Sequence, residues 1–210
     1  MKVLFVSPAG EVYGSERSMV ALFREKRFQA EVVCPGGGGL DRELQMQEVH
    51  VHRLTFGKYS MAQNPIWHLW FFSRFYRTMR RSRPDVLVIN LDGNTPWVTM
   101  ASRLCRVPFV RFSRFEFRAP SRWIDRWCWR RADAIICPSE SVKRQVVDWI
   151  GPERAGCVHR LYDPYSGRAA SSDEIGAFRR ELGVGGSRLV GFVGRLHRGK
   201  RVETVIRALP

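Results

Sequence analysis

Short runs of consecutive apolar residues alternate with segments of helical spacing along most of this chain, and this alternation constrains the fold more than any other feature. The first run, at residues 3–6, ends at Ser7-Pro8, as expected of a strand buried on both faces. Further strands are expected at 31–34, 50–54, 86–90, 109–112 and 134–137, and helices at 16–28, 40–47, 65–83, 96–104, 121–131 and 139–150. Strands separated by such helices pair in parallel through right-handed crossovers, so the sequence predicts a doubly wound, Rossmann-like α/β sheet.

A stretch rich in Gly, Pro and Ser at residues 151–172 indicates a linker. After it we expect a short helix at 174–182, a strand at 189–193 and the start of a helix at 200–209. One strand–helix pair cannot bury its own apolar face. We therefore expect one domain at residues 1–165, and at 166–210 a linker with the first strand–helix unit of an incomplete second domain.

The charge balance is strongly basic. The formal net charge is +15, from thirty arginines and five lysines against twenty acidic residues. Such a surplus favours a negative partner: nucleic acid, an anionic membrane surface or a phosphorylated substrate. The 44% of hydrophobic residues argues against a disordered chain, and no run approaches the roughly 20 apolar residues that span a bilayer. We expect a cytoplasmic protein that is soluble or attached to the inner face of the membrane.

The cysteines show no pattern of a metal or redox site. They form no Cys-x-x-Cys pair and have no histidine at metal-ligand spacing. We expect reduced, buried thiols rather than a catalytic cysteine, and we expect neither a metal nor another cofactor. The five are Cys34, Cys105, Cys128, Cys137 and Cys157.

The turn after the first strand carries Gly14, Ser15 and Glu16. A glycine at a strand-to-helix turn lets backbone N–H groups approach a ligand, and the helix N-terminus favours an anion. The turn does not read Gly-x-Gly-x-x-Gly, so a dinucleotide enzyme is disfavoured. A plain helix cap, with Ser15 as the capping residue, is the alternative interpretation.

A second turn, after the strand expected at 189–193, carries Arg195 and Lys200. Two cations at this spacing can both reach one diphosphate, and they would stabilise the charge that grows as the diphosphate departs. A basic loop without a special role is the alternative.

Taken in order, three segments resemble the family-4 retaining glycosyltransferases, which have the two-domain GT-B fold. Residues 14–17 (Gly-Ser-Glu-Arg) are similar to the family's Gly-Gly-x-Glu/Asp-Arg-type first loop, and residues 132–139 to its Ala-Asp-x-Ile-x-x-x-Ser segment. Residues 194–196 (Gly-Arg-Leu) together with Lys200 are similar to its donor loop. The resemblance covers residues 2–209.

The chain departs from the family pattern at several positions. Arg201 stands where the family usually has glycine, and of the family's linker motif only Asp163 matches. Residues 113–116 (Ser-Arg-Phe-Glu) stand where a histidine is usual, which leaves the catalytic residues unassigned. No pair of glutamates with seven residues between them occurs, so we expect most of the donor pocket to be missing and the chain alone to be inactive.

The resemblance implies that a hexose passes from a nucleotide-diphosphate donor to an acceptor with retention of configuration. It implies that Arg195 and Lys200 hold the donor diphosphate, and that Gly14, Ser15 and Glu16 line the cleft of an N-terminal, acceptor-side domain. The chain has no Asp-x-Asp, so cationic side chains would take the role of a metal. A lipid-linked acceptor in cell-envelope polysaccharide or glycolipid synthesis is a candidate.

Two expected helices mix tryptophan with arginine on one stripe, a combination typical of membrane interfaces. We expect Trp123, Ile124, Trp127 and Cys128 to face inward. A solvated face and nucleic-acid binding are the alternatives. The membrane-facing candidates are Trp67, Trp70, Arg74, Arg77 and Arg81 on one helix and Arg122, Arg126, Trp129 and Arg130 on the other.

Two functions outside glycosyl transfer stay open. A nucleic-acid-binding α/β protein would account for the basic charge and the aromatic–arginine mixing, although no helix-turn-helix, zinc-finger or RNA-recognition signature is found. A non-catalytic N-terminal fragment that serves as a binding module is the other.

Overall fold

The structure is a computed structural model that describes residues 1–56, 65–90, 95–113, 123–162, 168–194, 196 and 200–209. It consists of two compact units, Met1–Ser166 and Gly167–Pro210.

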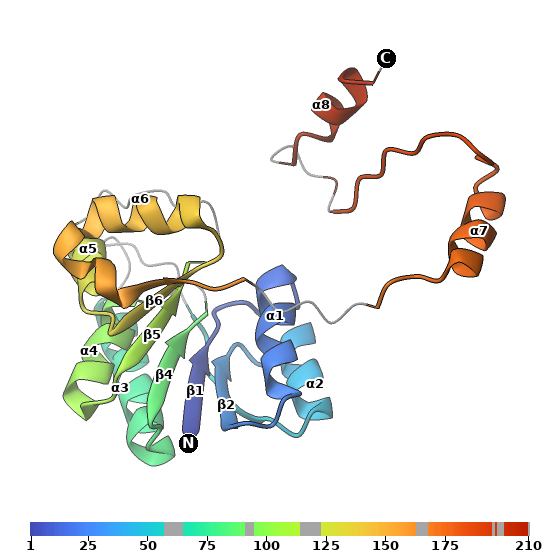
Figure 1. The fold of residues 1–210 in the computed structure, drawn as a ribbon. Coiled ribbons are helices and arrows are strands. Elements are labelled where there is room, and N and C mark those ends of the chain that lie inside the picture. Colours follow the sequence, from blue (N-terminus) through green and yellow to red (C-terminus); the bar gives the residue numbers. More distant parts are fainter. Residues whose placement is uncertain are drawn as a thin grey trace. The chain divides into compact units, whose positions relative to one another are not determined.

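The first unit is built on a sheet in which every strand pairing is parallel. Its described residues form seven strands in the order β3-β2-β1-β4-β5-β6-β7 (Figure 1). The order reverses direction between β1 and β4, which confirms the predicted doubly wound, Rossmann-like α/β fold. The strands are β1 (Lys2–Val6), β2 (Gln29–Cys34), β3 (His50–Arg53), β4 (Val86–Ile89), β5 (Phe109–Phe112), β6 (Ala134–Cys137) and β7 (Val158–Arg160).

Helices cover the sheet in two layers, because alternate residues of the central strand β1 point to opposite faces. Val3 and Phe5 share one apolar core with α1 and α2, whereas Leu4 and Val6 share the other with the helices from α3 to α6 (Figure 1). The helices are α1 (Gly14–Phe23), α2 (Gly39–Met46), α3 (Pro65–Ser82), α4 (Thr95–Cys105), α5 (Trp123–Arg130) and α6 (Glu140–Ile150), and a 3₁₀ turn, η1, spans Pro152–Cys157.

The largest differences from the predicted boundaries are at the end of α1 and in the predicted linker. α1 ends at Phe23 rather than at residue 28, because Lys26 takes a left-handed conformation and Gln29 already pairs with Lys2 in the sheet. The predicted linker at 151–172 contains η1 and the edge strand β7, whose Val158 pairs with Ile135. Three residues are too few for an apolar pattern to indicate a strand.

The second unit contains α7 (Ser172–Glu181) and α8 (Val202–Arg207). None of its described residues is buried. The strand predicted at 189–193 is wrong: these residues take no strand conformation, and Leu189, Val190 and Val193 are exposed. A lone strand has no neighbour to bond its N–H and C=O groups, so an apolar run without a partner strand does not form one.

No helix among the described residues has both the length and the apolar character needed to cross a lipid bilayer.

Candidate functional site

The first unit has its topological switch point between β1 and β4. In open α/β sheets, ligands bind at the carboxyl ends of the strands flanking such a point. Ser7 follows β1 and Asn90 follows β4, and both side chains are fully buried. Their backbones extend the sheet, because Ser7 N–H donates to Val33 O and Asn90 N–H donates to Val6 O, each at 3.0 Å.

A buried carboxyl group joins these two strand ends to the start of α1. Glu16 Oε1 accepts hydrogen bonds from Ser7 Oγ at 3.1 Å and from Asn90 Nδ2 at 3.3 Å. Glu16 Oε2 accepts from Ser15 Oγ at 2.9 Å and from the backbone N–H of Tyr13 at 3.3 Å. Residues from three segments of the chain thus converge on one side chain.

The three residues predicted to line the cleft, Gly14, Ser15 and Glu16, differ in how far they are buried. Gly14 is exposed at the first position of α1, and a Cβ atom added there would contact nothing within 4 Å. Ser15 is half-buried and bonds to Glu16, while Tyr13 is the N-cap, so the interpretation of Ser15 as the helix cap is wrong. The Glu16 side chain is fully buried, so it supports the loop from behind instead of lining a surface.

The glycine-rich loop after β2 packs against the loop after β1. Leu40 N–H donates to Gly10 O at 3.0 Å, and Gly39 N–H donates to Glu11 Oε2 at 3.2 Å. A Cβ atom on Gly38 would lie 2.0 Å from Gly10 O, which no side chain could tolerate. The contact between the two loops thus requires glycine at position 38.

An ion pair holds the second loop in place. Arg53 Nε lies 2.9 Å from Asp41 Oδ2 and its Nη2 lies 3.2 Å from Oδ1, so the guanidinium binds the carboxylate with two parallel hydrogen bonds. Gly37 N–H also donates to Asp41 Oδ2 at 2.8 Å. The hydrogen bonds from Arg53 lower the pKa of Asp41 below its ordinary value, and the one from Gly37 adds to this.

Of the two cations predicted to bind a diphosphate, Arg195 lies outside the described residues. Lys200 is exposed and precedes α8 by two residues. Arg201, at the N-cap of α8, has φ +48° and ψ +43°, a left-handed conformation that favours glycine. Arg201 stands at the position where the family that the sequence resembles usually has glycine.

The arginine stripe of α3 is exposed as predicted, and its tryptophans differ from one another. Trp67 is half-buried and stacks on Phe71 with ring centroids 5.6 Å apart, so it belongs to the rim of the core. Trp70 is 44% exposed, and the guanidinium of Arg74 lies 5.6 Å from its ring centre. The exposed cations of this stripe are Arg74, Arg77 and Arg81.

On α5 the predicted inward and outward faces are partly wrong. Trp129, predicted to face a membrane, is 4% exposed and packs edge-on against Trp149, with the Arg111 guanidinium 4.1 Å from its ring centre. Trp123, predicted to face inward, is 78% exposed. Cys128 is buried as predicted.

The arginines predicted to face outward on α5 have three outcomes. Arg126 is exposed. Arg130 donates hydrogen bonds to the carbonyl of Ile150 and, at 2.7 Å, to Glu153. The charge of Arg130 thus serves contacts within the fold. Arg122 lies outside the described residues.

The cysteine thiols are free, and three of them are buried. Burial raises the pKa of Cys34 to about 12 and that of Cys137 to about 11, so neither forms the nucleophilic thiolate at neutral pH. Within the described ranges, no group of three or more His, Cys, Asp or Glu side chains could hold a metal ion.

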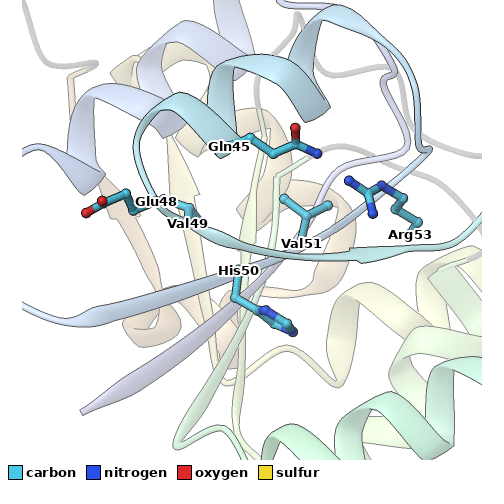
Figure 2. A pocket seen from close by; sticks show the side chains of 6 residues that line it. All are labelled: Gln45, Glu48, Val49, His50, Val51 and Arg53. Carbon is cyan, nitrogen blue, oxygen red and sulfur yellow. The ribbon is translucent and has the colours of Figure 1, made fainter.

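A depression of about 420 Å³ runs along the open edge of the sheet, beside β3. Figure 2 shows the polar side chains of Gln45, Glu48, His50 and Arg53 around it, together with Val49 and Val51. It lies two strands away from β1 and contains none of the residues that the sequence analysis selected.

Residues 14–164 match the family described as Glycosyltransferase Family 4. This chain belongs to glycosyltransferase family 4. The match begins at Gly14, in the turn that leads into α1, and extends beyond β7, so it spans most of the first unit.

Solved structures with the same fold include glycosyltransferases. Anabaena HepE (Alr3699), solved in complex with UDP-glucose, matches with a TM-score of 0.77 and 21% identity. The match covers 99% of this family-4 chain and 57% of HepE. A glycosyltransferase from Rickettsia africae matches with a TM-score of 0.63 and 10% identity, and the match covers 87% of this chain and 49% of the Rickettsia protein. The lipopolysaccharide outer core galactosyltransferase WaaB matches with a TM-score of 0.59 and 15% identity, and the match covers 99% of this chain and 72% of WaaB. A search of curated protein sequences finds no match.

Sequence reasoning about this family-4 chain missed Ser7 and Asn90. Both were noticed only as the ends of expected strands. A polar residue directly after a buried parallel strand lies at the edge where ligands bind, so position alone could have indicated them. Their convergence on Glu16 depends on the order of strands in the sheet, which no local pattern reveals.

Proposed function

We propose that this family-4 chain provides the N-terminal, acceptor-side domain of a glycosyltransferase that moves a sugar from a nucleotide-diphosphate donor to an acceptor. The family match over residues 14–164 carries the proposal. The chain spans 57% of the length of HepE, whose structure was solved with UDP-glucose, so the activity is assigned to the intact protein.

The proposed chemistry uses cations rather than a metal. Arg195 and Lys200 would bind the donor diphosphate and stabilise the negative charge that develops as the diphosphate leaves the sugar. The loop that carries Gly14 would meet the substrate at the switch point of the sheet. We further propose that the enzyme is a retaining hexosyltransferase, as the resemblance to family 4 implies.

The decisive assay is hydrolysis of a panel of nucleotide sugars by the intact protein. We expect turnover of at least one donor, and Arg195→Ala and Lys200→Ala should each lower kcat by about 100-fold, as expected when one contact to the leaving group is lost. Arg207→Ala, which removes an exposed cation from the same unit, is the matched control and should leave kcat unchanged. Near-normal turnover by both variants would refute the proposed diphosphate site.

We also propose that the α3 surface docks the enzyme on an anionic membrane at the cytoplasmic face, where a lipid-linked acceptor would be found. Three apolar side chains in the first turns of α3 are exposed: Ile66 by 71%, Leu69 by 64% and Trp70 by 44%. Arg74, Arg77 and Arg81 follow on the same helix. Aromatic and aliphatic side chains beside cations suit the headgroup region of a bilayer. Synthesis of cell-envelope polysaccharide or glycolipid fits such a location.

A triple variant tests the membrane proposal. Replacing Arg74, Arg77 and Arg81 by Gln should weaken binding to phosphatidylglycerol vesicles about 100-fold at low salt, since each cation near an anionic surface contributes about 1 kcal/mol. The control changes the same charge on the opposite helical layer, by replacing Arg24, Arg27 and Arg42 with Gln. Co-sedimentation measures both. Equal loss in the two triple variants would contradict a dedicated surface, and tighter binding to duplex DNA than to vesicles would favour the nucleic-acid alternative.

A further inference from the structure

Glu16 is a buried acidic side chain whose four partners all reach it as hydrogen-bond donors. Two of the partners, Ser7 Oγ and Ser15 Oγ, are hydroxyl groups that can either donate or accept. The other two, the Tyr13 backbone N–H and Asn90 Nδ2, can only donate. The two obligatory donors bind opposite oxygens, Tyr13 on Oε2 and Asn90 on Oε1.

This arrangement requires an acceptor on both sides of the side chain. An amide in place of the carboxyl group offers one oxygen and one NH₂ group. In either orientation, its NH₂ group would face Tyr13 N–H or Asn90 Nδ2, and a buried donor facing a donor is costly. Rotating the Asn90 amide to present its oxygen would turn that oxygen towards Ser15 O, which Nδ2 now faces at 3.5 Å. The site therefore selects a carboxyl group and distinguishes it from an amide of the same shape.

The carboxyl group connects the two strands of the switch point with the start of α1. Ser7 follows β1, Asn90 follows β4, and Tyr13 and Ser15 lie at the start of α1. Asn90 Nδ2 also lies 3.5 Å from Ser15 O, so the amide spans both the side chain and the backbone of this turn. On the outer side of the turn, Tyr13 is 48% exposed and Gly14 is exposed.

We propose that Glu16 is a positioning residue. Its buried carboxyl group holds residues 8–13 and the first turn of α1 against the carboxyl ends of β1 and β4, in the conformation in which this loop meets the nucleotide sugar. Glu16 itself does not touch the substrate, because its side chain is fully buried. The effect of Glu16 on turnover rests on the proposed function, whereas its effect on the loop rests on the hydrogen bonds alone.

The test exchanges donor and acceptor between two partners in the intact protein. Glu16→Gln should lower kcat/KM at least about tenfold, for the nucleotide sugar that the wild type turns over, and should speed hydrogen exchange of the amides of residues 9–15. Asn90→Asp alone should be similarly impaired, because two carboxyl groups then face each other. In the double variant the new amide donates to the new carboxyl group and its oxygen accepts from Tyr13 N–H, so most of both losses should be recovered.

The controls separate this role from a general effect on stability. Glu25→Gln changes an exposed carboxylate just beyond the end of α1 and should alter neither exchange nor kcat/KM. If Glu16→Gln lowers only the melting temperature, while kcat/KM and the amide exchange of residues 9–15 stay at wild-type values at 25 °C, the positioning role is refuted. A double variant no better than Glu16→Gln refutes it as well. A wild type that turns over no nucleotide sugar overturns the proposed function, and the exchange measurement still decides whether Glu16 fixes the loop.

Discussion

At the scale of single residues, Glu31 shows how a charge is accommodated inside the sheet. It lies on β2 and is 6% exposed, with Lys2 Nζ 3.0 Å from Oε1 and His52 Nε2 2.7 Å from Oε2. Burial alone would raise its pKa, but the hydrogen bonds from His52 and Lys2 outweigh burial and lower the pKa from 4.5 to about 2. The Glu31 carboxylate thus joins β1, β2 and β3 through its contacts with Lys2 and His52.

This pKa makes a prediction about stability in acid. Because the pKa is lower in the folded protein, the carboxylate stabilises the fold above about pH 4.5, and this contribution is lost as the pH falls towards 2. The loss should be about 3 kcal/mol, the free energy that corresponds to the shift in pKa. Urea unfolding of the wild type and of Glu31→Gln between pH 7 and pH 2 measures it. The difference between the two should shrink over this range, whereas Glu25→Gln should follow the wild type throughout.

At the scale of elements, the loops after β1 and β2 act as one unit. The bonds from Leu40 N–H to Gly10 O and from Gly39 N–H to Glu11 Oε2 hold them together, and Gly38 permits the close approach. A substituent at residue 38 would meet a backbone carbonyl rather than the movable end of a side chain. Neither loop can therefore shift without the other.

Gly38→Ala should consequently destabilise the protein by about 1–3 kcal/mol, the usual cost of forcing extra volume into a packed site. Urea unfolding gives the value. Gly156→Ala is the matched control, since an added Cβ atom there contacts nothing within 4 Å and the residue is not in the left-handed region. If the two variants are equally stable, the loops are not interlocked as the structure indicates.

The elements also show which features the sequence reveals. β1, β2 and β4 were predicted because a strand buried on both faces is a continuous apolar run, and the helices because their apolar residues recur at helical spacing. The orientation of α5 was not predicted correctly. Trp123 and Trp129 are chemically alike, and what decides between them is that Trp149 and Arg111 lie beside Trp129. Such neighbours come from distant parts of the sequence.

The candidate site shows the same limit. The turn at Gly14 could be found from its position after the first strand, since glycine and a helix start are local signals. The buried role of Glu16 could not, because Asn90, one of its two obligatory donors, lies 74 residues further along the chain. The strand expected at 189–193 failed for a related reason: its apolar residues have no described strand beside them.

At the scale of the whole molecule, part of the positive charge serves the fold itself. Arg103 bonds to the carbonyl of Arg131, Arg130 to that of Ile150, and Arg154 to that of Ala132. Each of these carbonyls lies at or just beyond the end of a helix, where backbone oxygens lack partners within the helix and cations are favoured. The net charge of +15 is therefore not a measure of partner binding alone.

The central position of β1 has a consequence for synthesis on the ribosome. β1 pairs with β2 on one side, Lys2 opposite Gln29, and with β4 on the other, Val3 opposite Val86. At about 5–20 residues per second, translation therefore leaves one edge of β1 open for roughly 4–16 seconds. During that time the nascent chain exposes an apolar strand edge that other chains could pair with. Newly made molecules should thus depend on chaperones until β4 has emerged.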